Sequence, residues 1–487
     1  MTLKLLIALF FLLLGGLGLY HTNKTLPAGI SYRGTVSTLQ DPILLTDVTR
    51  HHVDGTETRD QEIFDEVLRL IGGAEKFILL DMFLYNSTKP EDVTHRPLAL
   101  QLTDALIARK RARPEIEMVV ISDPLNTMYG GSRSPLFETL RQAGIQVVET
   151  SLSPMRDSNP AWSSIWRLCC QWLGNDPDGG WMSNALGDRK VTLRSYLALL
   201  NFKANHRKLL VVDQGPELRG LVTSANPHDG SSRHSNIGLS FTGDAVADLL
   251  RSERAVLAMS GAGTSSVDRW IAIAEGLEAP AEDSSPGARA SGSVMVLTES
   301  AIRATALDMI DRADSGDRLD LAMFYLSHRG IVESLLAAHS RGARLRVLLD
   351  PNNEAFGHAK SGIPNRQVAM ELHRAGVSVR WCNTRGEQCH SKLLMLRPEQ
   401  GDIEILLGSA NFTRRNLDDL NLETSVWLAQ SQNAPPARKV IHLFNEQWRL
   451  GPGNDPVMSL PYEAWADESG IRYWRYRIME FTGLSTF

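Results

Sequence analysis

Two short polar clusters in the sequence combine side chains that can act on a phosphate ester. The first cluster contains His206 and Lys208, and the second contains His390 and Lys392. Each cluster leads into an apolar run of strand length. Because alternate side chains of a strand point to the same face, we expect the histidine and the lysine of each cluster to lie side by side.

A second apolar run follows each cluster and ends in the sequence Ser-Ala-Asn. The residues are Ser224 and Asn226 in the first copy and Ser409 and Asn411 in the second. Each pair is two residues apart on a neighbouring strand, so it can join the histidine and the lysine. One half of the chain therefore supplies an imidazole, an ammonium, a hydroxyl and an amide. We expect two such sets to face each other across one cleft, related by a pseudo-twofold axis.

These groups suit the cleavage of a phosphodiester. Lys208 and Lys392 offer positive charge, and Asn226 and Asn411 offer amide donors, to the non-bridging oxygens as phosphorus becomes five-coordinate. One imidazole attacks phosphorus to give a phosphohistidine, and the other protonates the departing alkoxide. Water or an alcohol then takes the phosphoryl group. This scheme uses no metal or cofactor, and the sequence shows no carboxylate cluster with metal-ligand spacing.

The two clusters occupy the same place in an internal repeat. In each half a helical stretch leads to an apolar strand, at 77–83 in the first half and at 319–324 in the second. A later strand ends in Asp-Pro in both halves, at 118–124 and 345–351. Strands that alternate with helices indicate an α/β fold, and we expect a mixed, largely parallel sheet flanked by helices in each half.

We therefore expect two pseudo-symmetric α/β domains packed with the active site between them. The first comprises residues 30–275 and the second residues 294–487 with a C-terminal extension. A linker rich in Ala, Pro, Ser and Gly joins them at 276–293. The first domain carries an insertion at about 153–200 that holds four of the ten tryptophans. A helix packed over its own domain, or a lid or membrane-dipping element, would explain its aromatic face.

The two copies resemble the paired HKD motifs, His-x-Lys-x4-Asp followed by Gly-Ser-x-Asn, of the phospholipase D superfamily, which includes bacterial cardiolipin synthases and related phosphatidyltransferases. The resemblance covers nearly the whole body of the chain. It implies that His206 is the nucleophile and His390 the general acid. It also places Asp213, which completes the first motif, among the substrate-binding residues together with Ser224 and Ser409.

The sequence departs from these motifs in both copies. Arg397 occupies the Asp position of the second motif. Members of the superfamily resemble one another in placing a carboxylate beyond the motif asparagine to orient a catalytic histidine. Glu423 stands there in the second copy and Gly238 in the first. We therefore expect Glu423 to orient His390 and the first histidine to lack a carboxylate partner, which affects the reaction rate more than the reaction class.

The N-terminus is apolar from Leu5 to Tyr20, near the shortest length that spans a hydrocarbon core of about 30 Å. We expect a signal-anchor within residues 1–25 that leaves the catalytic body outside the cytoplasm. A cleaved signal peptide, which would make the protein secreted, is the alternative. The Gly-Leu-Gly at 16–18 matches a cleavage site only loosely, which favours the anchor.

Composition narrows the function. With 43% hydrophobic and 22% charged residues the chain is globular, and its net charge is −5. Because affinity for nucleic acid rests largely on phosphate neutralisation, this charge disfavours a nuclease without excluding one. We expect a membrane-associated phosphodiesterase or phosphatidyltransferase that takes a glycerophospholipid and passes the phosphatidyl group to water or an alcohol. A nuclease and a catalytically decayed membrane scaffold are the alternatives. Both half-sites lie in one chain, and nothing indicates an oligomeric state.

Three further features have plainer interpretations. His228 and His234 follow the first motif and are treated as solvated loop residues outside the site. Cys382 and Cys389 either form a disulfide or are ordinary thiols. The segment 472–477 alternates basic and aromatic residues, as does a segment that contacts a membrane surface or a nucleic acid; a solvated strand or helix is the alternative.

Overall fold

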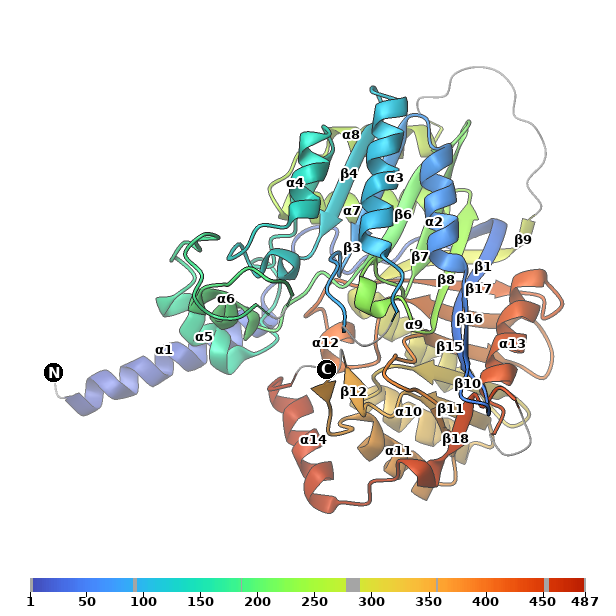
Figure 1. The fold of residues 1–487 in the computed structure, drawn as a ribbon. Helices are drawn as coiled ribbons and strands as arrows, with labels where there is room; N and C mark the ends of the chain where they lie inside the picture. The colour runs from blue at the N-terminus through green and yellow to red at the C-terminus, as the bar shows by residue number, and fades with distance from the viewer. Residues whose placement is uncertain are drawn as a thin grey trace.

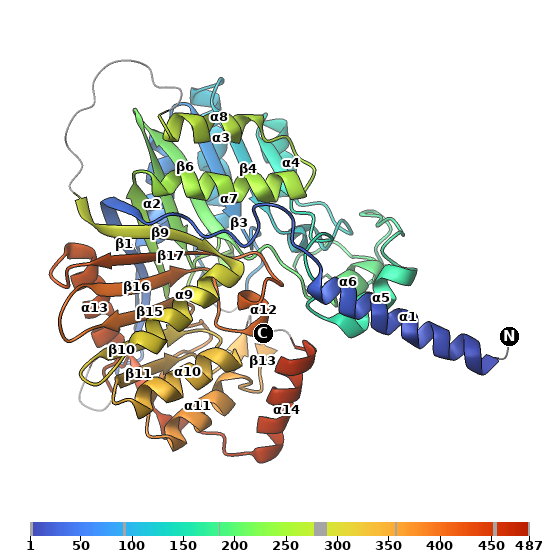
Figure 2. The ribbon, with the colours of Figure 1, turned by 180° about the vertical axis from the view of Figure 1, so that it is seen from behind.

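A long mixed sheet runs through the whole molecule (Figure 1). The structure, a computed structural model, describes residues 3–90, 94–184, 186–276, 290–355, 358–450 and 455–485. Helices cover both faces of the sheet in the first half. One face carries α2 (Glu62–Gly73), α3 (Leu98–Ala112) and α4 (Pro135–Gln142), and the opposite face, seen in Figure 2, carries α7 (Ala245–Met259) and α8 (Ser265–Ala274).

The first half contributes six consecutive strands to the sheet. Three pair in parallel: β3 (Phe77–Met82), β4 (Glu117–Ser122) and β5 (Gln146–Glu149). Three antiparallel strands continue from β3: β6 (Lys208–Gln214), β7 (Glu217–Thr223) and β8 (Asn236–Thr242). Every residue of β3 is buried, as expected of a continuous apolar strand covered by helices on both faces.

The second half has the same order of strands. Its parallel strands are β10 (Arg318–Met323), β11 (Arg344–Leu349) and β14 (Ser378–Cys382). Its antiparallel strands are β15 (Lys392–Arg397), β16 (Ile403–Gly408) and β17 (Thr424–Gln430). Its main helices are α9 (Glu299–Arg312), α10 (Arg329–Ser340), α11 (Asn365–Arg374) and α13 (Pro435–Gln447). The short elements are α12 (Arg414–Leu417), β12 (Glu354–Ala355), β13 (His358–Ala359) and β18 (Ser459–Pro461).

Two strands, β1 (Ser37–His51) and β9 (Ala290–Thr298), join the halves into one sheet. They pair with each other between β8 and β17, and β2 (Glu57–Gln61) pairs with β1. Residues 277–289 of the expected linker lie outside the described residues, whereas 290–293 belong to β9.

The sheet is mixed, as expected, but within the described residues the parallel strand pairs involve three strands in each half. The strands that carry the polar clusters pair antiparallel on both sides. β6 and β7 are joined by a tight turn at 215–216, and a connection that short permits only antiparallel pairing.

Two regions project from one side of this body, as both views show (Figures 1 and 2). The first combines the apolar helix α1 (Leu3–Asn23) with the insertion helices α5 (Pro160–Cys169) and α6 (Leu193–Leu199). The second is the C-terminal helix α14 (Gly470–Thr482). α1 is long and apolar enough to cross a membrane. It packs along α5, so the insertion lies against α1 rather than over the central sheet of its own half.

Candidate active site

One cleft, with a cavity of about 320 Å³, lies where the two halves meet. Both predicted histidines, His206 and His390, line it, and so do both predicted asparagines, Asn226 and Asn411. Much of the remaining wall is aromatic or aliphatic and comes from both halves: Phe83, Leu84, Leu125, Tyr129, Leu199, Phe202, Phe324 and Tyr325. The structure therefore brings the histidine and the asparagine of each half into a single pocket, whereas Lys208 and Lys392 are buried behind its wall.

The ends of the parallel strands hold the segments that carry the histidines. Asp123, just after β4, accepts a hydrogen bond from the backbone N–H of Asn205 at 2.6 Å. Asp350, just after β11, accepts one from the N–H of Cys389 at 2.8 Å. Each donor directly precedes a histidine. The two Asp-Pro sequences of the repeat thus fix the backbone at the entrance to β6 and β15.

Each histidine also pairs through its backbone with the opposite half. The N–H of His206 donates to the carbonyl of Leu422 at 2.9 Å, and the N–H of His390 donates to the carbonyl of Ser235 at 2.9 Å. Ser235 and Leu422 occupy corresponding places, one residue before the start of β8 and two residues before the start of β17. This crossing brings a side chain of the other half to the Nδ1 atom of each ring.

Glu423 is the partner of His206 and not, as expected, of His390. The Nδ1 atom of His206 lies 3.0 Å from Oε2 and 2.9 Å from Oε1 of Glu423. The carboxylate also accepts hydrogen bonds from Ser409 Oγ and Asn416 Nδ2. Although burial opposes ionisation, the interaction with the His206 ring and the charge of Lys208 hold the pKa of Glu423 below its ordinary value. The expected pairing was wrong because the two halves exchange these residues across the cleft.

The sequence analysis missed the partner of His390, which is Asn236. The Nδ1 atom of His390 lies 3.0 Å from Asn236 Oδ1. The same oxygen accepts a hydrogen bond from Ser224 Oγ at 3.0 Å, while Asn236 Nδ2 donates to the carbonyl of His234 at 3.0 Å. These contacts fix the amide with its oxygen toward the imidazole.

Asn236 is the structural counterpart of Glu423, although the count from the motif asparagine pointed to Gly238. The serine hydroxyls reveal the equivalence, since Ser224 Oγ accepts from the N–H that follows Asn236 at 3.0 Å, and Ser409 Oγ accepts from the N–H that follows Glu423 at 2.9 Å. The serine lies 12 residues before its partner in the first half and 14 residues before it in the second. This difference in loop length shifted the alignment. Both serines, expected to bind substrate, hold these partners in place.

The electrostatics of the cleft favour neutral imidazoles. Burial lowers the pKa of His206 to about 4, an effect that Glu423 opposes. Burial, followed by the charge of Lys392, lowers the pKa of His390 well below its ordinary value. Because Glu423 and the oxygen of Asn236 only accept hydrogen bonds, Nδ1 carries the proton in both rings. Each neutral ring therefore has its lone pair on Nε2, the atom that can attack phosphorus or hold a proton for the leaving group.

The two lysines lie beneath the histidines. Lys208 Nζ and Lys392 Nζ each donate at 2.7 Å to the carbonyl of the histidine two residues earlier. They lie 5.0 Å and 5.3 Å from the ring centres of Phe83 and Phe324. Burial lowers the pKa of Lys208 to about 7 and that of Lys392 well below its ordinary value. A bound anion would stabilise the charged form of both ammonium groups.

The two asparagines differ in their hydrogen bonds. Asn226 Oδ1 accepts from the backbone N–H of Leu84 at 3.3 Å, which leaves its amide N–H groups as donors. Asn411 Oδ1 is buried and has no hydrogen-bond partner among the described residues. Both side chains can therefore turn an amide donor toward a phosphate oxygen in the cleft.

Asp213 lies at the other end of β6 and outside the cleft. Its carboxylate accepts hydrogen bonds from the backbone N–H groups of Glu75, Lys76 and Phe77, at 2.8 to 3.1 Å. These groups precede β3, so Asp213 stabilises a turn of the fold. Arg397 ends β15 at the corresponding place. The departure from the motif therefore lies away from the pocket.

His228 and His234, interpreted as solvated, are both buried. His234 Nδ1 accepts from the backbone N–H of Gln388 at 3.1 Å, and its ring centre lies 5.8 Å from that of His390. His234 therefore packs beside the second catalytic candidate. Sequence reasoning lacked a signal for this placement, because it depends on contact between the halves.

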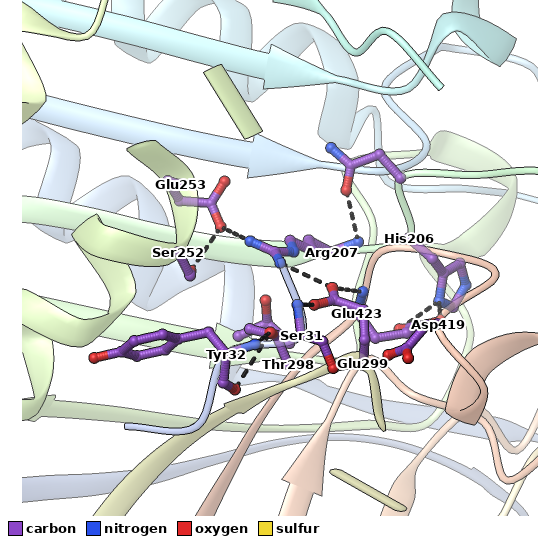
Figure 3. A network of polar contacts seen from close by, with 12 residues as sticks. Ser31, Tyr32, His206, Arg207, Ser252, Glu253, Thr298, Glu299, Asp419 and Glu423 are labelled. Carbon is purple, nitrogen blue, oxygen red and sulfur yellow. Dashed lines mark hydrogen bonds and ion pairs between the residues drawn. The ribbon is translucent and has the colours of Figure 1, made fainter. Parts of the chain in front are cut away.

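A buried ion network lies beneath the His206 half-site (Figure 3). Arg207 has no exposed surface and donates to Glu253 at 2.7 Å and to Glu299 at 2.8 Å. Glu299 also accepts from the backbone N–H of Glu423 at 2.9 Å. The network thus joins the residue directly before β6, together with α7 and α9, to the residue that orients His206.

One group of side chains outside the cleft has the geometry of a metal site. His51, Glu57 and Glu387 place their ligand atoms within 4.8 Å of one another. The guanidinium of Arg233, however, forms ion pairs with both Glu57 and Glu387. Both carboxylates already have a cationic partner, so the group fits an ion-pair network better than a metal centre.

The family described as "Cardiolipin synthase, PLD-like domain" matches residues 306–448. No curated protein matches the sequence. The solved structures with a similar fold include phosphatidylserine synthase from Haemophilus influenzae Rd KW20, with a TM-score of 0.55 and 11% identity over 96% of this chain and 99% of that chain. This likeness shows that the two chains share their fold.

Two other solved structures have lower TM-scores. A polyphosphate kinase from Porphyromonas gingivalis has a TM-score of 0.46 and 14% identity over 91% of this chain, which spans 53% of the length of that kinase. The phospholipase D family member Nuc from Salmonella typhimurium has a TM-score of 0.26 and 18% identity over 34% of this chain and 99% of that chain.

Proposed function

We propose that this chain, whose residues 306–448 match the cardiolipin synthase, PLD-like domain family, is a phospholipase D-type phosphodiesterase or phosphatidyltransferase that works through a phosphohistidine. The observation that carries the proposal is the shared cleft of His206 and His390. Each ring is fixed at Nδ1 by a side chain of the opposite half, so both Nε2 atoms are available to one substrate.

His206 is the nucleophile in this proposal, and His390 is the acid. When Nε2 of His206 bonds to phosphorus, positive charge develops on the ring, and the Glu423 carboxylate at Nδ1 stabilises that charge. His390 faces a neutral amide and gains no such stabilisation. The acid is the form of His390 that carries a second proton, on Nε2, and this proton is therefore more easily passed to the leaving oxygen.

The reaction proceeds in two displacements. In the first, the bond between His206 Nε2 and phosphorus forms, the bond to the leaving oxygen breaks, and that oxygen takes the proton of His390. In the second, the oxygen of water or an alcohol attacks phosphorus while His390 accepts its proton, and the bond to His206 breaks. Lys208 and Lys392, together with the amides of Asn226 and Asn411, stabilise the charge on the non-bridging oxygens.

The walls of the cleft support a glycerophospholipid as the substrate. Leu199 and Phe202, at the end of the insertion, line the cleft together with Leu125 and Tyr129. These side chains can contact the apolar part of a lipid. Lys203, Lys360 and Arg415 also line the cleft, but the net charge of −5 on the whole chain disfavours a nucleic acid. In this proposal α1 is a signal-anchor, the body lies outside the cytoplasm, and residues 30–275 and 294–487 form the two domains.

The test uses the full chain, purified and reconstituted into vesicles that contain labelled phosphatidylglycerol. We expect release or transfer of the labelled phosphatidyl group, and loss of both activities in the His206→Ala and His390→Ala variants. A parallel assay presents single-stranded DNA. Turnover of DNA but not of lipid would replace the proposal with a nuclease, and turnover of neither would leave a non-catalytic membrane protein.

A further inference from the structure

We propose that α14 and the insertion form a second membrane contact, separate from α1, that seats the mouth of the cleft on the bilayer surface. We call this surface the docking face. It consists of exposed apolar side chains from two regions: Ile471, Trp474, Ile478 and Phe481 of α14, and Trp172, Leu173 and Trp181 of the insertion.

α14 is a two-sided helix. Its inner face contacts the body through Tyr476, whose hydroxyl donates to the carbonyl of Ser327 at 3.0 Å. Its outer face carries Ile471, with 85% of its surface exposed, and Phe481, with 83%. The outer apolar residues recur at intervals of three and four positions, which places them in one stripe. A contiguous exposed stripe of this kind marks an interaction surface.

The insertion extends this apolar surface. Trp172 is 78% exposed and Trp181 is 65% exposed. The two regions meet at Ser158, where Arg415 Nε donates to Ser158 Oγ at 2.8 Å and the same guanidinium contacts the carbonyl of Ser485. Arg415 also lines the cleft. The docking face therefore borders the active-site pocket.

The end of α14 is held tightly against the insertion. Gly483 follows α14 with a positive φ of 74°, and a Cβ at this position would lie 2.1 Å from the carbonyl oxygen of Ser158. Only glycine permits this approach. The relative position of α14 and the insertion is thus set by backbone contact.

The position of α1 indicates that the occupant is a lipid bilayer. α1 is only 6% buried over its most apolar stretch, and it packs on α5, where a Cβ at Gly18 would lie 3.0 Å from Ser164 Oγ. α1, the insertion and α14 lie on one side of the molecule (Figures 1 and 2). A membrane entered by α1 therefore meets the insertion and α14.

The composition of α14 supports the same occupant. Arg472 and Arg475 are exposed beside Trp474 on this helix. A mixture of arginine, tryptophan and large aliphatic residues is typical of helices that lie in the membrane interface, where the cations meet lipid phosphates and the apolar side chains enter the acyl region. The lipid head group can then reach the cleft while its acyl chains stay in the bilayer.

A fluorescent probe tests the contact independently of the proposed enzymatic activity. The full chain carrying Ile478→Cys is labelled with an environment-sensitive dye and reconstituted into vesicles that contain nitroxide lipids. We expect a blue-shifted emission that the nitroxide quenches. The matched control is Val53→Cys, since Val53 is 73% exposed at the turn between β1 and β2. Equal emission and equal quenching at the two positions would overturn the proposal.

The consequence for turnover rests on the proposed function, and its test uses two substrates. The Ile471→Asp/Phe481→Asp variant should turn over vesicle phosphatidylglycerol about tenfold more slowly, because burial of two large apolar side chains in the interface is lost. Its turnover of a small water-soluble phosphodiester should match the parent, as should both activities of Val53→Asp. An equal loss on both substrates would overturn the docking role, whereas an inactive parent would contradict the proposed function alone.

Discussion

The two half-sites share a scaffold and differ in the side chain that faces each ring. In both, an Asp-Pro sequence holds the backbone before the histidine, and a serine hydroxyl holds the partner of the ring. That partner is a carboxylate, Glu423, for His206 and an amide, Asn236, for His390. Two half-sites with nearly the same backbone can therefore play different roles, because the carboxylate or amide that faces each ring decides which ring can carry a positive charge.

The residue that follows each histidine also differs between the half-sites, and only the first half-site has a charged residue there. Arg207 follows His206 and joins Glu253 and Glu299 in a fully buried network. Ser391 stands at the corresponding place after His390. The backbone around the His206–Glu423 pair is thus tied to both halves by charged groups.

The largest effect should come from removing one ring at a time. We expect His206→Ala to lower kcat by about 10⁴-fold or more on any diester, because the nucleophile is lost. His390→Ala should cost about 10²–10⁴-fold on an alkyl ester. With a nitrophenyl diester, whose leaving group needs no proton, His390→Ala should retain formation of the phosphohistidine. Single-turnover assays measure both steps, and the opposite pattern would exchange the two roles.

Glu423→Gln would make the first half-site resemble the second. We expect kcat to fall by about 10²–10³-fold, less than for loss of a triad aspartate, because the amide oxygen can still hold Nδ1–H but carries no charge. The amount of phosphohistidine that accumulates, measured through its acid-labile phosphorus signal, should fall in parallel. A variant with the kcat of the parent would show that the carboxylate does not assist the nucleophile.

Asn236→Asp would make the second half-site resemble the first. Burial and Lys392 hold the pKa of His390 low, so its acid form becomes scarce as pH rises and kcat/KM should fall. A carboxylate at position 236 raises that pKa, and we expect the basic limb of the pH profile to move up by about one unit or more. Asn236→Ala is the control, since it removes the hydrogen bond without adding charge. If the basic limb of the pH profile stays in place in both variants, His390 is not the general acid.

The smallest effect on activity should follow changes at the far ends of β6 and β15. Asp213→Ala removes the acceptor of three backbone N–H groups and should lower the free energy of unfolding by about 1–3 kcal/mol. Arg397→Asp, which completes the second motif, should leave kcat/KM unchanged. Thermal unfolding and steady-state kinetics test both variants. A large loss of kcat in a folded Asp213→Ala protein would place this residue in catalysis after all.

Local patterns in the sequence were sufficient to locate the strands and the reacting side chains. The apolar runs after Lys208 and Lys392 are β6 and β15, and both histidines reach the cleft. Local patterns were insufficient to predict whether neighbouring strands pair in parallel or antiparallel, because this direction depends on the connections between the strands. They also placed His228 and His234 in solvent, since burial there comes from the other half.

The sequence by itself determined that two equivalent sets of phosphate-handling groups exist, because each set lies within a few residues and repeats at the same place. Only the tertiary structure decided how the sets divide the work. The residues that face the rings are 217 and 154 positions away along the chain, for His206 and His390 respectively. Contacts over such separations arise from the packing of the two halves, which no local spacing encodes.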